Sequence, residues 1–99
     1  MEEEYNGWTN KETWAVKLHW DNNQGDQEFF SEQAREYEKV KGLHDFADFL
    51  RDTAETIFNM VIDEGQGTSE AKNFVKDVGS LWRVNWQEIA KAYFDECDR

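Results

Sequence analysis

The chain has 99 residues, of which 22 are acidic and 11 are basic, so its formal net charge is −11. A chain of this length supports one hydrophobic core, which predicts a single domain over residues 1–99. The charge repels nucleic acid and anionic lipid. We therefore expect no direct binding to nucleic acid or to a membrane, and a partner that is basic.

The composition also predicts a helical protein of the cytoplasm. The chain has no proline and many helix-forming residues, which indicates an all-α fold, a compact bundle of about five helices. One cysteine allows no internal disulfide, and no apolar run approaches the roughly 20 residues that span a bilayer. The acidic start opposes a secretory signal. Residues 1–7 are polar, and we expect them to be flexible.

The first predicted helix begins at a capping box. The Thr9 hydroxyl is placed to accept a hydrogen bond from the Glu12 amide, while the Glu12 carboxylate reaches back to Thr9. This pattern predicts a helix over about 9–21, which the polar stretch 22–25 ends. Apolar residues fall on two sides of this helix, so both sides are candidates for burial: Trp14, Val16, Leu18 and Trp20.

The next two helices carry the clearest apolar periodicity. Asp26 is a cap residue for a helix over about 26–41, which Gly42 ends, and the short loops favour antiparallel neighbours. A longer helix over about 43–64 has one broad apolar face and is predicted to be central. The residues expected on the apolar faces are Phe29, Phe30, Tyr37 and Val40, then Phe46, Phe49, Leu50, Ala54, Ile57, Met60 and Val61.

Two more helices complete the predicted bundle. After the flexible connector 65–67, Thr68 or Ser69 caps the fourth helix. Asn85 and Glu88 resemble a second capping box and open the last helix. The residues expected to face the core are Ala71, Phe74, Val75, Val78 and Trp82 in the fourth helix and Trp86, Ile89, Ala90, Tyr93 and Phe94 in the last.

Two motifs bracket nearly the whole chain: Asn6-Gly7-Trp8-Thr9-Asn10-Lys11-Glu12-Thr13-Trp14 and Val84-Asn85-Trp86-Gln87-Glu88-Ile89-Ala90. The chain thereby resembles an uncharacterised family of short acidic proteins found in phages, plasmids and bacterial genomes. The resemblance implies a mobile-element setting, and it brings no activity and no catalytic residues. Both motifs are helix starts with tryptophan attached. Their indoles either pack together as structure or, alternatively, form a binding surface of Trp8, Trp14 and Trp86.

The long central helix carries an acidic stripe opposite its apolar face. Asp45, Asp48, Asp52, Glu55 and Asp63 project within roughly 80° of arc. Their axial spacing of roughly 5 Å is of the same order as the ~3.4 Å between phosphates along one DNA strand. Such a helix can imitate a nucleic-acid backbone, although a charged row is most often a solvated face.

A second acidic row lies on the preceding helix. Glu28, Glu32 and Glu36 follow one another at i, i+4 spacing, where like charges destabilise a helix by a few tenths of a kcal/mol per pair, about 0.2–0.5. Arg35 and Lys39 are near enough in sequence to neutralise part of the row. We include these three glutamates among the candidate partner-binding residues.

No motif for catalysis, a cofactor or a metal is present. His19 and His44 lack zinc-binding spacing, and no calcium loop, phosphate loop or nucleophile elbow occurs. Cys97 lies between Glu96 and Asp98, whose charges disfavour a reactive thiolate. We therefore expect no enzyme, no cofactor and no metal. A small hydrolase or metal protein is a third interpretation, which predicts carboxylates with perturbed pKa values in a pocket.

Two hypotheses of function follow from the residues and the resemblance. In the first, a phage or mobile-element protein in the cytoplasm of its bacterial host inhibits a nucleic-acid-binding defence complex, as anti-CRISPR and antirestriction proteins do. The acidic stripe and row then substitute for DNA phosphates against a basic host protein. In the second, the chain is a structural or accessory module that binds through Trp8, Trp14 and Trp86, and its acidity serves only solubility.

Overall fold

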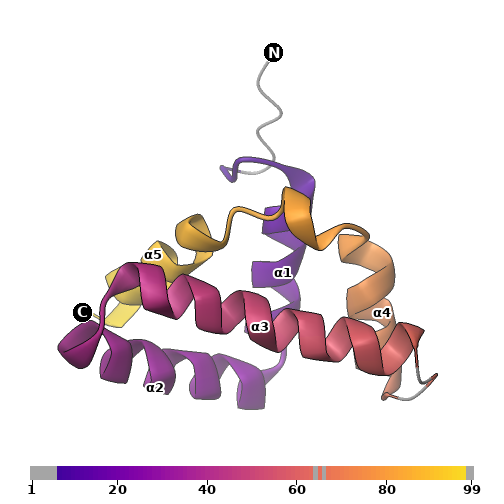
Figure 1. The fold of residues 1–99 in the computed structure, drawn as a ribbon, viewed down its shortest axis with the longest axis horizontal. Helices are drawn as coiled ribbons and strands as arrows, with labels where there is room; N and C mark the ends of the chain where they lie inside the picture. Colours follow the sequence, from indigo (N-terminus) through magenta and orange to yellow (C-terminus); the bar gives the residue numbers. More distant parts are fainter. Residues whose placement is uncertain (1–6, 64, 66, 98–99) are drawn as a thin grey trace.

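The computed structural model describes residues 7–63, 65 and 67–97. This part of the chain forms five α-helices and one short 3-10 helix (Figure 1). The prediction of an all-α bundle of about five helices is confirmed. The expected flexibility of residues 1–7 concerns residues that, except for Gly7, lie outside the described part of the chain. The helices are α1 (Lys11–Asn22), α2 (Gln24–Val40), α3 (Leu43–Ile62), α4 (Ser69–Val78), η1 (Leu81–Arg83) and α5 (Trp86–Cys97).

The long helix α3 is central, as predicted, and packs against α2, α4 and α5. α2 and α3 run antiparallel, joined by Lys41 and by Gly42, whose φ of 116° favours glycine. The antiparallel arrangement expected for α1 and α2 is wrong. Asn23 alone links these two helices, and it turns the chain so that α1 lies crosswise to α2 and packs against α4 (Figure 1).

Stacked aromatic rings fill the core between these helices. The Trp20 ring lies 4.1 Å from that of Phe30 and 5.8 Å from that of Phe74, which joins α1, α2 and α4. On α2 the buried stripe is narrower than predicted and contains Phe30 and Ala34, so the flanking residues Phe29 and Val40 remain exposed. Leu18 of α1 is exposed as well.

A buried lysine joins α1 to α5, which the apolar pattern did not indicate. Lys17 is only 4% exposed. Its ammonium donates hydrogen bonds to Asp21 at 2.6 Å and to Glu96 at 3.0 Å, and it lies 4.5 Å from the centre of the Tyr93 ring. Two carboxylates and an aromatic face thus replace the water that the charge gives up.

The fourth helix ends earlier than predicted, and this changes the position of Trp82. Gly79 has a φ of 79°, and its N–H donates to the Val75 carbonyl as the C-cap of α4. Trp82 therefore belongs to η1 and is 93% exposed, so its predicted burial on the face of the fourth helix is wrong.

Within the part that the structure describes, none of the helices has the length and apolar character needed to cross a bilayer.

Candidate functional site

The two tryptophan motifs of the sequence form one joint between the starts of α1 and α5. Asn10, not Thr9, caps α1: its side-chain oxygen accepts hydrogen bonds from the Thr13 amide at 2.9 Å and the Thr13 hydroxyl at 2.7 Å. The Asn10 amide group donates to the Arg83 carbonyl oxygen at 2.7 Å. The predicted capping box is wrong, because the Thr9 N–H instead donates to the Glu88 carboxylate at 3.2 Å.

The start of α5 completes the joint from the other side. The Asn85 side chain accepts a hydrogen bond from the Glu88 amide at 3.1 Å, as a cap should. The Asn85 N–H donates to the Thr13 hydroxyl at 2.9 Å, 72 residues away in sequence. Arg83 and Glu12 add an ion pair at 3.4 Å. Each helix start therefore satisfies backbone groups of the other, so we assign both motifs a structural role.

The three tryptophans of the alternative binding surface belong to this joint. Trp8, Trp14 and Trp86 are each half-buried and pack against the core. The Trp86 ring lies 6.3 Å from that of buried Trp20, tilted by 35°. The core thus covers part of each of the three indoles, and only the remaining part is open to a partner.

The acidic stripe of α3 faces solvent along its length. Asp45, Asp52, Glu55 and Asp63 are exposed and Asp48 is half-buried. At about 1.5 Å per residue, α3 presents these groups along roughly 30 Å, with Asp63 just beyond its last residue.

One arginine neutralises the middle of the stripe. Arg51 lies 3.6 Å from the Asp48 carboxylate and 4.0 Å from that of Glu55. His44 adds a third contact, at 3.7 Å from Asp48. Among the described residues, Asp45, Asp52 and Asp63 have no ion-pair partner, so these three carboxylates are the most available to a basic protein.

The row on α2 is exposed as well, and Glu28, Glu32 and Glu36 all face solvent. Glu28 accepts a hydrogen bond from Gln24 at 3.1 Å. Within the described part of the chain, no ion pair joins Arg35 or Lys39 to the row. The row of glutamates therefore keeps its negative charge, although Arg35 and Lys39 are near enough in sequence to neutralise part of it.

Three helices carry more acidic than basic side chains, and the excess is largest on α2 and α3. α3 carries four carboxylates and one arginine, and α2 carries five carboxylates against one arginine and one lysine. α1 and α4 each carry two acidic and two basic side chains, apart from histidine. α5 carries three carboxylates against one lysine, but Glu88 accepts a hydrogen bond from the Thr9 N–H, Asp95 pairs with Lys91 and Glu96 pairs with Lys17. The exposed rows on the neighbouring helices α2 and α3 therefore hold most of the negative charge that the described residues leave uncompensated.

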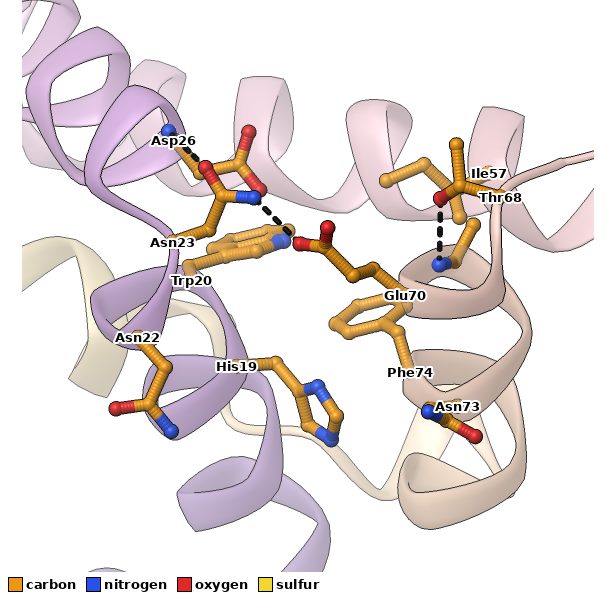
Figure 2. A pocket seen from close by; sticks show the side chains of 11 residues that line it. His19, Trp20, Asn22, Asn23, Asp26, Ile57, Thr68, Glu70, Asn73 and Phe74 are labelled. Atoms are coloured by element: carbon orange, nitrogen blue, oxygen red, sulfur yellow. Dashed lines mark hydrogen bonds between the residues drawn. The ribbon is translucent and has the colours of Figure 1, made fainter.

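A pocket of about 380 Å³ lies among α1, α4 and the start of α2. Figure 2 shows Trp20 and Phe74 within it and polar groups around them. The Asn23 amide donates to Glu70 at 2.6 Å, and His19 lies 2.8 Å from the Asp77 carboxylate. Its lining residues are His19, Trp20, Asn22, Asn23, Asp26, Ile57, Thr68, Glu70, Ala71, Asn73 and Phe74.

One carboxylate in this pocket has a perturbed pKa, as the interpretation of the chain as a small hydrolase or metal protein predicts. Partial burial raises the pKa of Asp26, and the negative charge of Glu70 raises it further. The neighbouring contacts are structural, because Asn23 caps α2 through the Asp26 amide at 3.0 Å and ties it to Glu70 of α4. Over the described residues, no three His, Cys, Asp or Glu side chains group as metal ligands. The side chain of Cys97 lies outside this description.

Sequence reasoning missed Trp82, the most exposed aromatic side chain of the residues that the structure describes. It lines two hollows next to the acidic stripe, both of which also include Glu55. Gly79 was the signal that could have placed it outside α4, because glycine is the commonest residue just past the end of a helix.

A comparison with protein families matches residues 1–99 to DUF7249, a family of unknown function. The chain belongs to this family. Neither the curated proteins nor the solved structures gave a match to it.

Proposed function

Because the family to which the chain belongs brings no activity with it, we propose a function from the geometry. The protein is an acidic binding module that occupies the nucleic-acid-binding surface of a basic protein partner. The carboxylates of α3 substitute for phosphates, and those of α2 form a second row. The observation that carries this proposal is the pair of exposed carboxylate rows on α2 and α3, while α1 and α4 are balanced and the three carboxylates of α5 have hydrogen-bond or ion-pair partners.

The spacing and rigidity of α3 support the proposal. Its exposed carboxylates recur every three or four residues, and its other face is fixed in the core by Phe46, Leu50 and Ala54. A charged row on a packed helix loses little side-chain freedom beyond that of the carboxylates when a partner binds. Electrostatic attraction of this kind accelerates association and weakens steeply as salt increases.

The biological setting is a finer part of the same proposal. A phage or plasmid protein in the cytoplasm of a bacterial host would use such a surface against a defence complex that binds nucleic acid. Anti-CRISPR and antirestriction proteins are the classes with this activity. The motivation is the small size, the net charge of −11 and the resemblance to proteins of mobile elements.

Charge reversal on α3 tests the proposal directly. We expect Asp45→Lys with Asp52→Lys to relieve inhibition of DNA cleavage in a panel of restriction and CRISPR nucleases, because both carboxylates are exposed. The matched control, Glu70→Lys with Asp95→Lys, changes the net charge equally on α4 and α5 and should still inhibit. Circular dichroism checks that both variants are folded. Equal inhibition by both variants, or inhibition that only Trp86→Ala removes, would overturn the proposal in favour of the aromatic surface.

Removing the positive charge of Arg51 should strengthen binding to a basic partner, which gives a second test. We expect Arg51→Gln to tighten binding of a hexalysine peptide by about twofold to fivefold at low salt, since exposed ion pairs are worth about 0.2–1 kcal/mol and their loss frees Asp48 and Glu55. Isothermal titration calorimetry measures the affinity. Lys91→Gln on α5 makes the same charge change away from the stripe, so an equal gain in that variant would contradict the role of the stripe.

A further inference from the structure

The surface around Trp82 is the most exposed apolar feature of the described residues. The Trp82 side chain is 93% exposed, and neighbouring Ile62 at the end of α3 is 63% exposed. A tryptophan can bury roughly 150–250 Å². An indole left in water beside a second apolar side chain is typical of a binding surface.

The backbone holds Trp82 outward. A 3-10 helix has about three residues per turn, so Leu81 and Val84 lie on the same side of η1, and Trp82 points elsewhere. Leu81 is half-buried and Val84 is 7% exposed. The Asn10 amide fixes the end of η1 through the Arg83 carbonyl. Trp82 therefore cannot turn inward without removing Leu81 and Val84 from the core.

Trp82 forms a ridge between two hollows. The larger, of about 380 Å³, lies between the end of α3 and residues 79–82, and its lining includes Phe58, Ile62 and Leu81. The smaller, of about 220 Å³, lies on the side of Trp86 and Val84. The indole borders both, so a side chain seated in either hollow can contact it.

The negative charge of the larger hollow favours a cationic side chain. Glu55 and Asp63 line it, both exposed, and no lysine or arginine is among its lining residues. An apolar floor, an indole and two carboxylates together favour a cation with a flat face. A guanidinium group fits, because it stacks on an indole and donates paired hydrogen bonds to a carboxylate. Lysine has no such plane.

We propose that Trp82, Glu55 and Asp63 receive an arginine side chain of the basic protein partner. This inference deepens the proposed function: α3 provides attraction at long range, and Trp82 provides an anchor that prefers arginine to lysine. The guanidinium lies against the indole in the larger hollow. The Asp63 carboxylate, which has no ion pair among the described residues, is its first hydrogen-bond acceptor, and Glu55, which Arg51 approaches at 4.0 Å, is the second.

Uncharged substitutions of Trp82 test this inference with a hexa-arginine peptide as the probe. Calorimetry at fixed salt is expected to show Kd rising about threefold to tenfold in Trp82→Leu, which keeps apolar surface but has no π-face. Trp82→Phe should restore much of the affinity. Hexalysine binding should change less. In the NMR spectrum of the unaltered protein, the Trp82 indole N–H should shift on addition of hexa-arginine.

The outcomes separate this inference from the proposed function. If Trp82→Leu binds hexa-arginine as tightly as the unaltered protein, the arginine site is wrong, whatever the nuclease assays show. If Trp82→Leu and Trp82→Phe bind hexa-arginine with equal affinity, residue 82 contributes only apolar contact, and the arginine site is again wrong. Failure of the α3 charge reversal to relieve nuclease inhibition contradicts the proposed function, even when Trp82 binds arginine.

Discussion

Replacing Asn10 with alanine is expected to lower the free energy of unfolding by about 3 kcal/mol, a large effect for one polar side chain. Loss of an N-cap costs about 1 kcal/mol. The substitution also leaves the buried Thr13 hydroxyl and the part-buried Arg83 carbonyl without this partner, and an unsatisfied buried group costs about 1–3 kcal/mol. Asn10 and Thr13 are 8% and 0% exposed, so water replaces these bonds poorly.

Thr68→Ala is the matched control for this prediction. Thr68 caps α4 by accepting a hydrogen bond from the Ala71 amide at 3.1 Å, but it is exposed and, within the described part of the chain, its side chain bonds to no other helix. Urea denaturation should therefore show a loss of only about 1 kcal/mol. Equal losses in the two variants would mean that Asn10 is an ordinary cap and that the joint between α1 and α5 adds nothing.

Raising the pH above about 10 is expected to destabilise the protein through Tyr93. Burial raises the pKa of the Tyr93 hydroxyl above its ordinary value near 10, and the charges of Asp21, Glu96 and Asp26 raise it further. The unfolded chain then releases this proton while the folded protein keeps it. Because the unfolded state binds fewer protons, stability falls by about 1.4 kcal/mol for each pH unit above 10. Below pH 10 the contribution is fully present.

Tyr93→Phe isolates this effect, since every other titrating group is present in both proteins. The difference in unfolding free energy between the two should be constant from pH 7 to about pH 9. Between pH 10 and 12 it should shift by up to about 2.8 kcal/mol in favour of the phenylalanine variant. Parallel curves over the whole range would show that Tyr93 ionises as easily in the folded protein as in the unfolded chain.

Local signals in the sequence were sufficient for most of the helices. The apolar face of α3 was correctly predicted from periodicity, with Phe46, Leu50 and Ala54 fully buried. Asn85 was correctly identified as a cap, and of the two residues considered for α4, Thr68 or Ser69, Thr68 is the cap. Each of these features is set by residues that follow one another at intervals of three or four positions. Local sequence is therefore sufficient to predict them.

The errors arose where distant residues compete for the same groups. Thr9 and Glu12 satisfy the capping rule, but Glu88 takes the Thr9 N–H, and Asn10 caps α1 while bonding to Arg83. Burial of Lys17 likewise depends on Glu96, 79 residues away. No local pattern predicts these pairings.

The candidate site was predicted in part. The eight acidic residues were expected on solvent-facing sides of their helices, and seven are exposed, with Asp48 half-buried. Their binding of a partner stays a prediction. The ion pairs of Arg51 with Asp48 and Glu55 follow from the same spacing but were not anticipated. Trp82 was assigned to the core, because apolar periodicity was extended through Gly79 into a segment that is not part of α4.

The most direct measurement of the central claim is an affinity capture from bacterial lysate at low and high salt. It compares the unaltered protein with a variant in which Asp45, Asp48, Asp52 and Glu55 become their amides. Captured proteins are identified by mass spectrometry and assayed for DNA binding. We expect the unaltered protein to capture a DNA-binding complex at low salt only and to block its DNA binding, and the amide variant to capture none. Capture of the same proteins by both forms, at both salt concentrations, would contradict phosphate mimicry by α3.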